Sequence, residues 1–313
     1  MDKSFLDLNR IVEECNLFDD SDVNSVIEKI QNLDLSYEKE NLIKIYSYML
    51  AISRNPDIIM ALIQCLDRFR DKESISALLD LLLLKNIDLD RDLYINPRAM
   101  CAKAIANLKD TSAVTPLLYC LNNKDENYKV RLACADALGK IGDRYAVAPL
   151  IEVVKDEEEK SVYLRESAAS ALGMIGDLRA VDPLVSILET QKGIWSKFTF
   201  LKERVIEALG KLRLDDNERV FNALKHSLDD ESPQIRINAI EAIMDSENPQ
   251  AVEIIRNCLT EDKDEEVKKN AMIALYNLIG REILDEVANS SEFSDTLKVE
   301  AVSMISEYED CDE

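Results

Sequence analysis

Apolar and polar side chains alternate along the middle of the chain with the period of a one-sided helix. The apolar residues Cys134, Ala135 and Leu138 lie three, four and seven positions after Arg131, on one stripe of a helix. Gly142 follows where that helix should end in a left-handed cap. Asp143 comes next and suits the start of a second helix. The pattern therefore predicts a hairpin of two helices.

The second helix of three hairpins carries the segment Ala-Val-x-Pro-Leu. Its proline lies early in the helix, where a missing backbone donor costs least. The prolines concerned are Pro116, Pro149 and Pro183.

This hairpin is repeated along the chain. Residues 95–123, 128–156 and 162–190 match one another nearly position for position. One basic residue marks each copy, and its steps are 33, 34, 37, 34, 32 and 30 residues. Fixed periods of this size are typical of solenoids, in which neighbouring copies share one apolar seam. The basic residues are Arg98, Arg131, Arg165, Lys202, Arg236, Lys268 and Lys298.

The repeat predicts an all-α fold, an alpha-alpha superhelix built from antiparallel helix pairs. We expect residues 1–313 to form a single elongated solenoid. Residues 95–280 hold the regular repeats, residues 1–94 an irregular N-terminal set and cap, and residues 281–313 the C-terminal cap helices and an acidic tail. In the N-terminal part we expect helices over residues 3–16, 22–33, 37–53, 57–69 and 73–85.

The recurring Arg, Ala-Leu-Gly, Ile-Gly-Asp and Ala-Val-x-Pro-Leu segments resemble the HEAT-like repeats typified by phycocyanobilin lyase (PBS lyase) subunits. The resemblance covers about residues 95–280. It implies a HEAT-like solenoid with the basic-residue helix on its concave face. The family includes lyases, a metal hydroxylase and many adaptors, so the resemblance does not fix the function. The hydroxylase branch needs several His-Glu pairs, whereas the one histidine here, His226, is followed by Ser227.

Other chemical motifs are missing from the sequence. Seven cysteines form no CxxC pair, and no glycine motif fits a phosphate loop. We therefore expect no catalytic residues, no metal site and no cofactor. Cys101 and Cys134 occupy a small-residue position of the repeat and should lie in the core, whereas Cys15 and Cys311 fall outside this register and are expected to be exposed.

The net charge of −23 bears on the choice of partner. Such a surface repels phosphate backbones, so we expect neither nucleic acid nor an anionic membrane as a partner. The charge serves either solubility or a basic partner, and the sequence leaves both open. The N-terminus lacks the features of a signal peptide and no apolar run is long enough to span a bilayer, so we expect a cytoplasmic protein.

The repeated arginines also suggest an internal ladder. Arg98, Arg131 and Arg165 each have an aspartate twelve residues later. We expect these pairs, with Arg236 as a further member, to tie neighbouring turns together rather than to bind a ligand. The aspartates are Asp110, Asp143 and Asp177.

Exposed aromatic side chains mark the candidate binding surface. Tyr128 and Tyr163 precede their marker arginines by two or three residues, and Phe200 lies in the corresponding place before Lys202. The longest repeat step contains an insert, residues 191–200, with the only tryptophan. The insert serves either to bind a partner or to plug a gap between repeats. The predicted partner-binding residues are Tyr128, Tyr163, Trp195, Phe198, Phe200 and Arg204.

These observations predict a scaffold or adaptor that binds another protein or peptide through its concave face, without catalysis. The alternative, carried by the family resemblance, is a bilin lyase or chromophore-handling subunit that acts on phycobiliproteins. The sequence does not indicate an oligomeric state.

Overall fold

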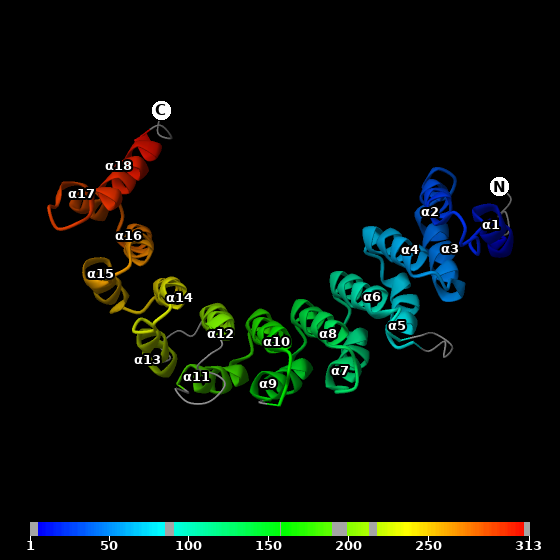
Figure 1. Ribbon diagram of the computed structural model, residues 1–313, viewed down its shortest axis with the longest axis horizontal. Helices are drawn as coiled ribbons and strands as arrows, with labels where there is room; N and C mark the ends of the chain where they lie inside the picture. The colour runs from blue at the N-terminus through cyan, green and yellow to red at the C-terminus, as the bar shows by residue number, and fades with distance from the viewer. Residues whose placement is uncertain (1–5, 85–90, 157, 190–198, 213–217, 310–313) are drawn as a thin grey trace. The chain divides into compact units, whose positions relative to one another are not determined.

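The computed structural model of the chain is all-α, and no strand occurs in the ranges that it describes (Figure 1). The backbone forms two compact units, residues 1–175 and 176–313. The predicted fold class, an alpha-alpha superhelix of helix pairs, is confirmed. The single solenoid over residues 1–313 stays a prediction. The described residues are 6–84, 91–156, 158–189, 199–212 and 218–309.

In the first unit, helices α4, α6, α8 and α10 pack side by side, and α5, α7 and α9 pack against α6, α8 and α10 as a second layer (Figure 1). We call the two layers the first-helix and second-helix layers. The helices of this unit are α1 (Leu8–Cys15), α2 (Val23–Asn32), α3 (Lys39–Ile52), α4 (Pro56–Phe69), α5 (Ile75–Leu82), α6 (Ile95–Leu108), α7 (Val114–Asn122), α8 (Tyr128–Ile141), α9 (Val147–Lys155) and α10 (Val162–Ile175).

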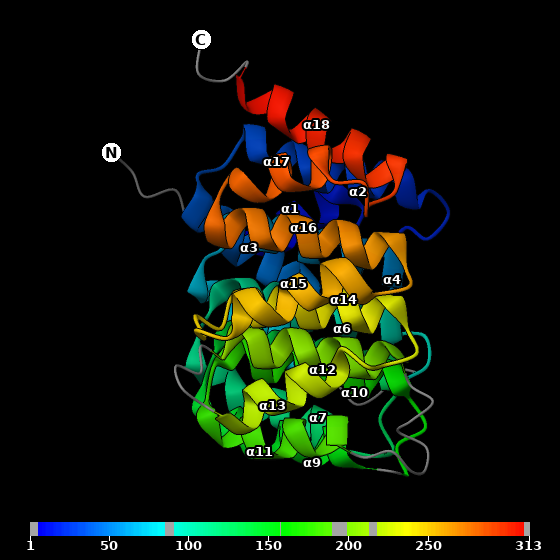
Figure 2. The ribbon, with the colours of Figure 1, turned by 90° about the vertical axis from the view of Figure 1, so that its left-hand side faces the viewer.

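The second unit repeats this arrangement. Its first-helix layer contains α12, α14, α16 and α18, and its second-helix layer contains α11, α13, α15 and α17. Figure 2 shows the helices of each layer stacked in chain order. The helices are α11 (Val181–Glu189), α12 (Thr199–Lys211), α13 (Glu218–Ser227), α14 (Pro233–Met244), α15 (Ala251–Glu261), α16 (Glu265–Ile279), α17 (Glu282–Asn289) and α18 (Asp295–Glu309).

Small side chains set the spacing within the first-helix layer. The residue three positions after each marker arginine is buried, as predicted; Cys101, Cys134 and Ala168 are each fully buried. Helices α8 and α10 are in close contact, because a Cβ added to Gly139 would lie 2.7 Å from the Cα of Ala171. Glycine at this position therefore lets two helix backbones approach each other.

The turns after α6, α8 and α10 share one capping pattern, which the sequence predicted for α8 and α10. Gly142 and Gly176 have φ values of 78° and 72°, in the left-handed region. Lys109 takes the same place after α6 with a φ of 48°. The next residue is an aspartate whose side chain accepts a hydrogen bond from the N–H two residues later, which starts the 3-10 turn that leads into the second helix. These 3-10 turns are Thr111–Ala113, Arg144–Ala146 and Leu178–Ala180.

The five helices predicted for the N-terminal part are all present as α1 to α5, with small differences at their ends. Helix α1 begins at Leu8, where the side chain of Asp7 caps it by accepting a hydrogen bond from the N–H of Arg10. Residues 3–5 and 85 of the predicted ranges lie outside the described residues.

Candidate partner-binding surface

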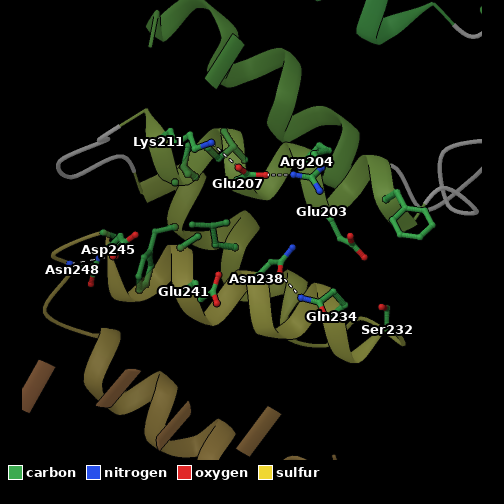
Figure 3. A pocket seen from close by; sticks show the side chains of 18 of the residues that line it. Glu203, Arg204, Glu207, Lys211, Ser232, Gln234, Asn238, Glu241, Asp245 and Asn248 are labelled. Atoms are coloured by element: carbon green, nitrogen blue, oxygen red, sulfur yellow. Dashed lines mark hydrogen bonds and ion pairs between the residues drawn. The ribbon is translucent and has the colours of Figure 1, made fainter. Parts of the chain in front are cut away.

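A groove lies on the first-helix layer of the second unit, with a volume of about 1460 Å³ (Figure 3). Side chains of α12 form one wall, and side chains of α14 with the residues that follow it form the other. Val220, Phe221 and Leu224 of α13 add an apolar part to the lining.

Each wall is one stripe of its helix. Residues three and four apart lie on the same helix face, so both stripes follow the sequence spacing directly. The α12 stripe is Phe200, Arg204, Glu207 and Lys211, and the α14 stripe is Gln234, Asn238, Glu241 and Asp245.

The α12 wall is internally neutralised. Glu207 accepts hydrogen bonds from Nη1 of Arg204 and from Nζ of Lys211, both at 2.6 Å. The hydrogen bond from Lys211, with the charge of Arg204, holds the pKa of Glu207 below its usual range. Both basic side chains of the wall are therefore engaged with one carboxylate.

The α14 wall is arranged differently. Nε2 of Gln234 donates to Oδ1 of Asn238 at 2.8 Å. Farther along, the carboxylates of Glu241, Asp245 and Glu247 line the groove. In the described part of the chain these three carboxylates make neither a hydrogen bond nor an ion pair. The wall thus combines an amide pair with uncompensated negative charge.

The predicted partner-binding residues fall in three places. Phe200, which is 69% exposed, and Arg204 line the groove of the second unit. Tyr128 and Tyr163 are exposed at the starts of α8 and α10 in the first unit. Trp195 and Phe198, with most of the predicted insert, lie outside the described residues.

The first unit has a smaller groove of about 450 Å³ on its first-helix layer. It crosses α4, α6 and α8, and Nδ2 of Asn107 donates to Oδ1 of Asp67 across it at 2.8 Å. Lys103 and Lys140 add positive charge to this lining. Sequence reasoning did not find either groove, because a groove depends on which side chains of two separate helices face each other.

Buried arginines tie neighbouring turns together at Arg98 and Arg131, but the partners predicted for these two arginines, Asp110 and Asp143, were wrong. The pairing of Arg165 with Asp177 stays a prediction. Arg98 donates from Nη1 to Oε1 of Glu126 at 2.9 Å and from Nε to the carbonyl of Leu82 at 2.8 Å. Arg131 donates in the same way to Glu159, at 2.6 Å, and to the carbonyl of Leu121. Each arginine therefore joins the end of the preceding second helix to the loop before the next first helix.

The ladder continues in the second unit. Arg236 forms a two-point contact with Asp262, with both distances 2.8 Å, and Nζ of Lys202 lies 2.7 Å from Oδ2 of Asp230. The acid follows the basic residue by 28 positions at Arg98, Arg131 and Lys202, and by 26 at Arg236. This recurring spacing is the signal from which the sequence could have revealed the correct pairs.

The ion pairs of the ladder are buried, so that each charged side chain depends on its partner. Arg98 and Glu126 are only 2% and 5% exposed at their side chains. Although burial opposes ionisation of Glu126, the hydrogen bonds from Arg98 and from the N–H of Asn127 hold the pKa of its carboxyl below the usual range. The Asp262 carboxyl follows the same balance: burial opposes ionisation, and Arg236 keeps the pKa low.

The three aspartates that the sequence predicted as ladder partners contact groups close to them in the chain or at the turn. Asp110 accepts from the backbone N–H of Ser112, which with Lys72 lowers the pKa of Asp110 to about 2. Asp143 accepts from the N–H of Tyr145, and Asp177 contacts Arg179. A backbone N–H two residues away is nearer than an arginine in the adjacent helix, so the aspartate carboxylate accepts a hydrogen bond from that N–H and caps the 3-10 turn.

The thiols are mostly packing groups. Cys101 and Cys134 are buried, as predicted. The prediction for Cys15 was wrong, because it is 2% exposed and completes the apolar stripe of α1 with Ile11 and Val12. Burial raises the pKa of the Cys15 thiol. Cys311 lies outside the described residues.

Grouped metal ligands and membrane-spanning helices are both absent from the described ranges. In the described ranges, no three His, Cys, Asp or Glu side chains are grouped so that they could hold a metal ion. None of the helices described combines the length and the apolar character that a membrane span requires. His226 is exposed on α13.

Solved structures similar to this chain are helical repeat proteins with low sequence identity. A triple mutant of Kap121p is 14% identical, over 94% of this chain and 36% of that chain, with a TM-score of 0.58. The complex of CpcE and CpcF of phycocyanin lyase from Nostoc sp. PCC7120 is 23% identical over 71% of this chain and 88% of that chain, with a TM-score of 0.44. Human deoxyhypusine hydroxylase is 17% identical over 86% and 95%, with a TM-score of 0.34.

At these identities the similarity concerns the fold alone. No curated protein sequence matches this chain significantly. The family model for HEAT repeats matches residues 87–162, 124–194 and 198–276, which together span more than half of the chain. This match agrees with the helix pairs of both units, and the chain belongs to the family of HEAT-repeat proteins.

Proposed function

We propose that this protein is a non-catalytic scaffold or adaptor that binds another protein or a peptide through its first-helix layer. The observation that supports the proposal most is the exposure of large aromatic side chains on this layer. Tyr163 is 66% exposed on α10, and Phe200 is 69% exposed on α12. Exposed aromatic side chains contribute disproportionately to binding energy in protein interfaces.

Each unit also provides a groove on the same layer. Side chains of successive first helices line both grooves. Repeat proteins present extended binding surfaces of this kind, because every repeat adds one helix to the same layer.

A matched pair of tyrosines tests the proposal. Tyr119 on α7 is exposed to the same 66% as Tyr163, but it lies in the second-helix layer. A tagged full-length protein would be incubated with an extract of the native cell, and captured proteins would be identified by mass spectrometry. Tyr163→Ala should reduce capture of the partner by about tenfold or more, the size of a binding hot spot. Tyr119→Ala should leave capture unchanged.

Two results would contradict the proposal. One is equal capture by both variants and the unchanged protein. The other is the absence of any specifically captured protein. Circular dichroism on each variant would verify that the helices are retained.

A further inference from the structure

The groove of the second unit has dimensions that suit an extended chain. Helix α12 contains 13 residues, so the groove wall is about 20 Å long. An extended peptide advances about 3.3 Å per residue, so roughly six residues fit along this wall. The lining contains both polar and apolar side chains. This favours an extended peptide over an amphipathic helix, which binds through a hydrophobic groove.

The amide pair on α14 matches the polar groups of a peptide backbone. The hydrogen bond from Gln234 to Asn238 uses one donor of Gln234 and one acceptor of Asn238. The carbonyl oxygen of Gln234 and the amide N–H₂ of Asn238 keep further hydrogen-bonding capacity. Both lie on the stripe that faces the groove (Figure 3). Together they offer one acceptor and one donor, as a peptide bond requires.

The charge of the groove selects the side chains of that peptide. The lining contains the carboxylates of Glu203, Glu207, Glu241, Asp245 and Glu247 but only two basic side chains, Arg204 and Lys211. Both basic side chains already contact Glu207. The excess negative charge therefore remains on the α14 wall.

This excess lies toward the C-terminal ends of the two helices. Figure 3 shows Lys211 of α12 at the same end of the groove as Asp245 and Asn248, which follow the end of α14. The C-terminal end of a helix carries partial negative charge, and two such ends add to the field of the carboxylates. A cationic side chain is stabilised there.

From this geometry we propose that the groove between α12 and α14 binds an extended segment of a partner protein that carries lysine or arginine. The amides of Gln234 and Asn238 hold its backbone, and Glu241 and Asp245 bind its cationic side chain. Phe200 supplies an apolar contact at the other end of the groove. The proposal rests on the proposed adaptor function and specifies the kind of partner.

An array of short synthetic peptides of random sequence, probed with the labelled full-length protein, tests the proposal. Bound peptides should be enriched in lysine and arginine. The strongest binder would then be titrated by fluorescence anisotropy. Gln234→Ala combined with Asn238→Ala should weaken binding about tenfold. Glu241→Gln combined with Asp245→Asn should weaken it to a similar extent and reduce its salt dependence.

Matched controls lie on the second-helix layer of the same unit. Asn222→Ala on α13 removes an exposed amide, and Glu253→Gln on α15 removes an exposed carboxylate. Neither change should alter peptide binding. Free spermine, a polycation without peptide bonds, should compete only weakly if the amide pair contributes as proposed.

Three results would overturn the groove assignment: selection of acidic or uncharged peptides, no bound peptide at all, or full binding by both double variants. These results are distinct from failure of the adaptor function. If Tyr163→Ala still lowers capture of a cellular partner, the adaptor function stands and the groove is not its peptide site. If no cellular partner is captured, the adaptor function itself fails.

Discussion

Gly139 and Gly210 are two helical glycines that differ in the space available for a methyl group. At Gly139 an added Cβ would lie 2.7 Å from the Cα of Ala171, which is backbone and cannot rotate away. At Gly210 it would lie 3.4 Å from the Cβ of Ala242, in ordinary contact. The same substitution should therefore change stability in opposite directions.

We expect Gly139→Ala to lower the free energy of unfolding by about 1–3 kcal/mol, because α8 and α10 must move apart. Gly210→Ala should raise it by about 0.5 kcal/mol, because alanine favours helix more than glycine does. Urea denaturation followed by circular dichroism measures both. Changes of the same sign in the two variants would contradict the close backbone approach between α8 and α10.

Glu126 is the residue on which the Arg98 side chain depends for its charge balance. We expect Glu126→Ala to lower the free energy of unfolding by about 3–5 kcal/mol, because it leaves a buried guanidinium without its acid. Glu14→Ala is the control, since its ion pair with Arg10 lies at the surface. That control should not change the urea midpoint measurably. A small effect of Glu126→Ala would show that water replaces the carboxylate.

At the scale of the helix, the left-handed cap after α6 is formed by a residue other than glycine. Lys109 adopts a φ of 48° where the next repeat has Gly142. We expect Lys109→Gly to raise the free energy of unfolding by about 1 kcal/mol, because glycine adopts this conformation without steric strain. Gly142→Ala should lower it by a similar amount. Thermal unfolding of the two variants checks both signs, and equal midpoints would exclude strain at Lys109.

Helix positions could be predicted from the sequence because their signals are local. Gly142, Asp143 and Pro149 mark a helix end, a cap and an early helix position within eight residues. The partners of Arg98 and Arg131 could not be predicted in this way, because each lies in the loop before the next repeat. A local pairing with Asp110 or Asp143 was the simpler interpretation, and the backbone caps exclude it.

The candidate site was predicted only in part. The exposure of Tyr163 and Phe200 follows from their place relative to the marker basic residue. The carboxylates of the α14 wall gave no signal, because Glu241 and Asp245 are ordinary surface residues until α12 is placed opposite them. The burial of Cys15 was missed because α1 lies outside the regular repeat.

For the whole molecule, the buried ion pairs imply that stability depends on pH in acid. The pKa values of Glu126 and Asp262 are lowered in the folded state. Their stabilising contribution is therefore complete above the unfolded-state pKa values, about 4, and is lost as pH falls through the lower folded-state values. We expect the urea midpoint to be constant near neutrality and to fall below about pH 5. A midpoint that rises on acidification would contradict this linkage.

The bilin-lyase alternative leads to an expectation for the whole protein as well. A scaffold that binds no chromophore should leave the visible absorption spectrum of added phycocyanobilin unchanged. A shifted spectrum that survives gel filtration would instead favour a chromophore-handling role.

The arginine that joins one hairpin to the loop before the next determines where a truncated fragment of this chain can end without losing a buried counter-ion. A fragment that ends with α9 at Lys155 would retain the buried Arg131 but lose Glu159, its counter-ion. Extending the same fragment by a few residues beyond Glu159 restores the charge balance without adding a helix. A segment that is removed, exchanged or duplicated should therefore begin just after one of these acids and end just after the next, for example after Glu126 and after Glu159. Each segment then keeps its buried arginine together with its counter-ion.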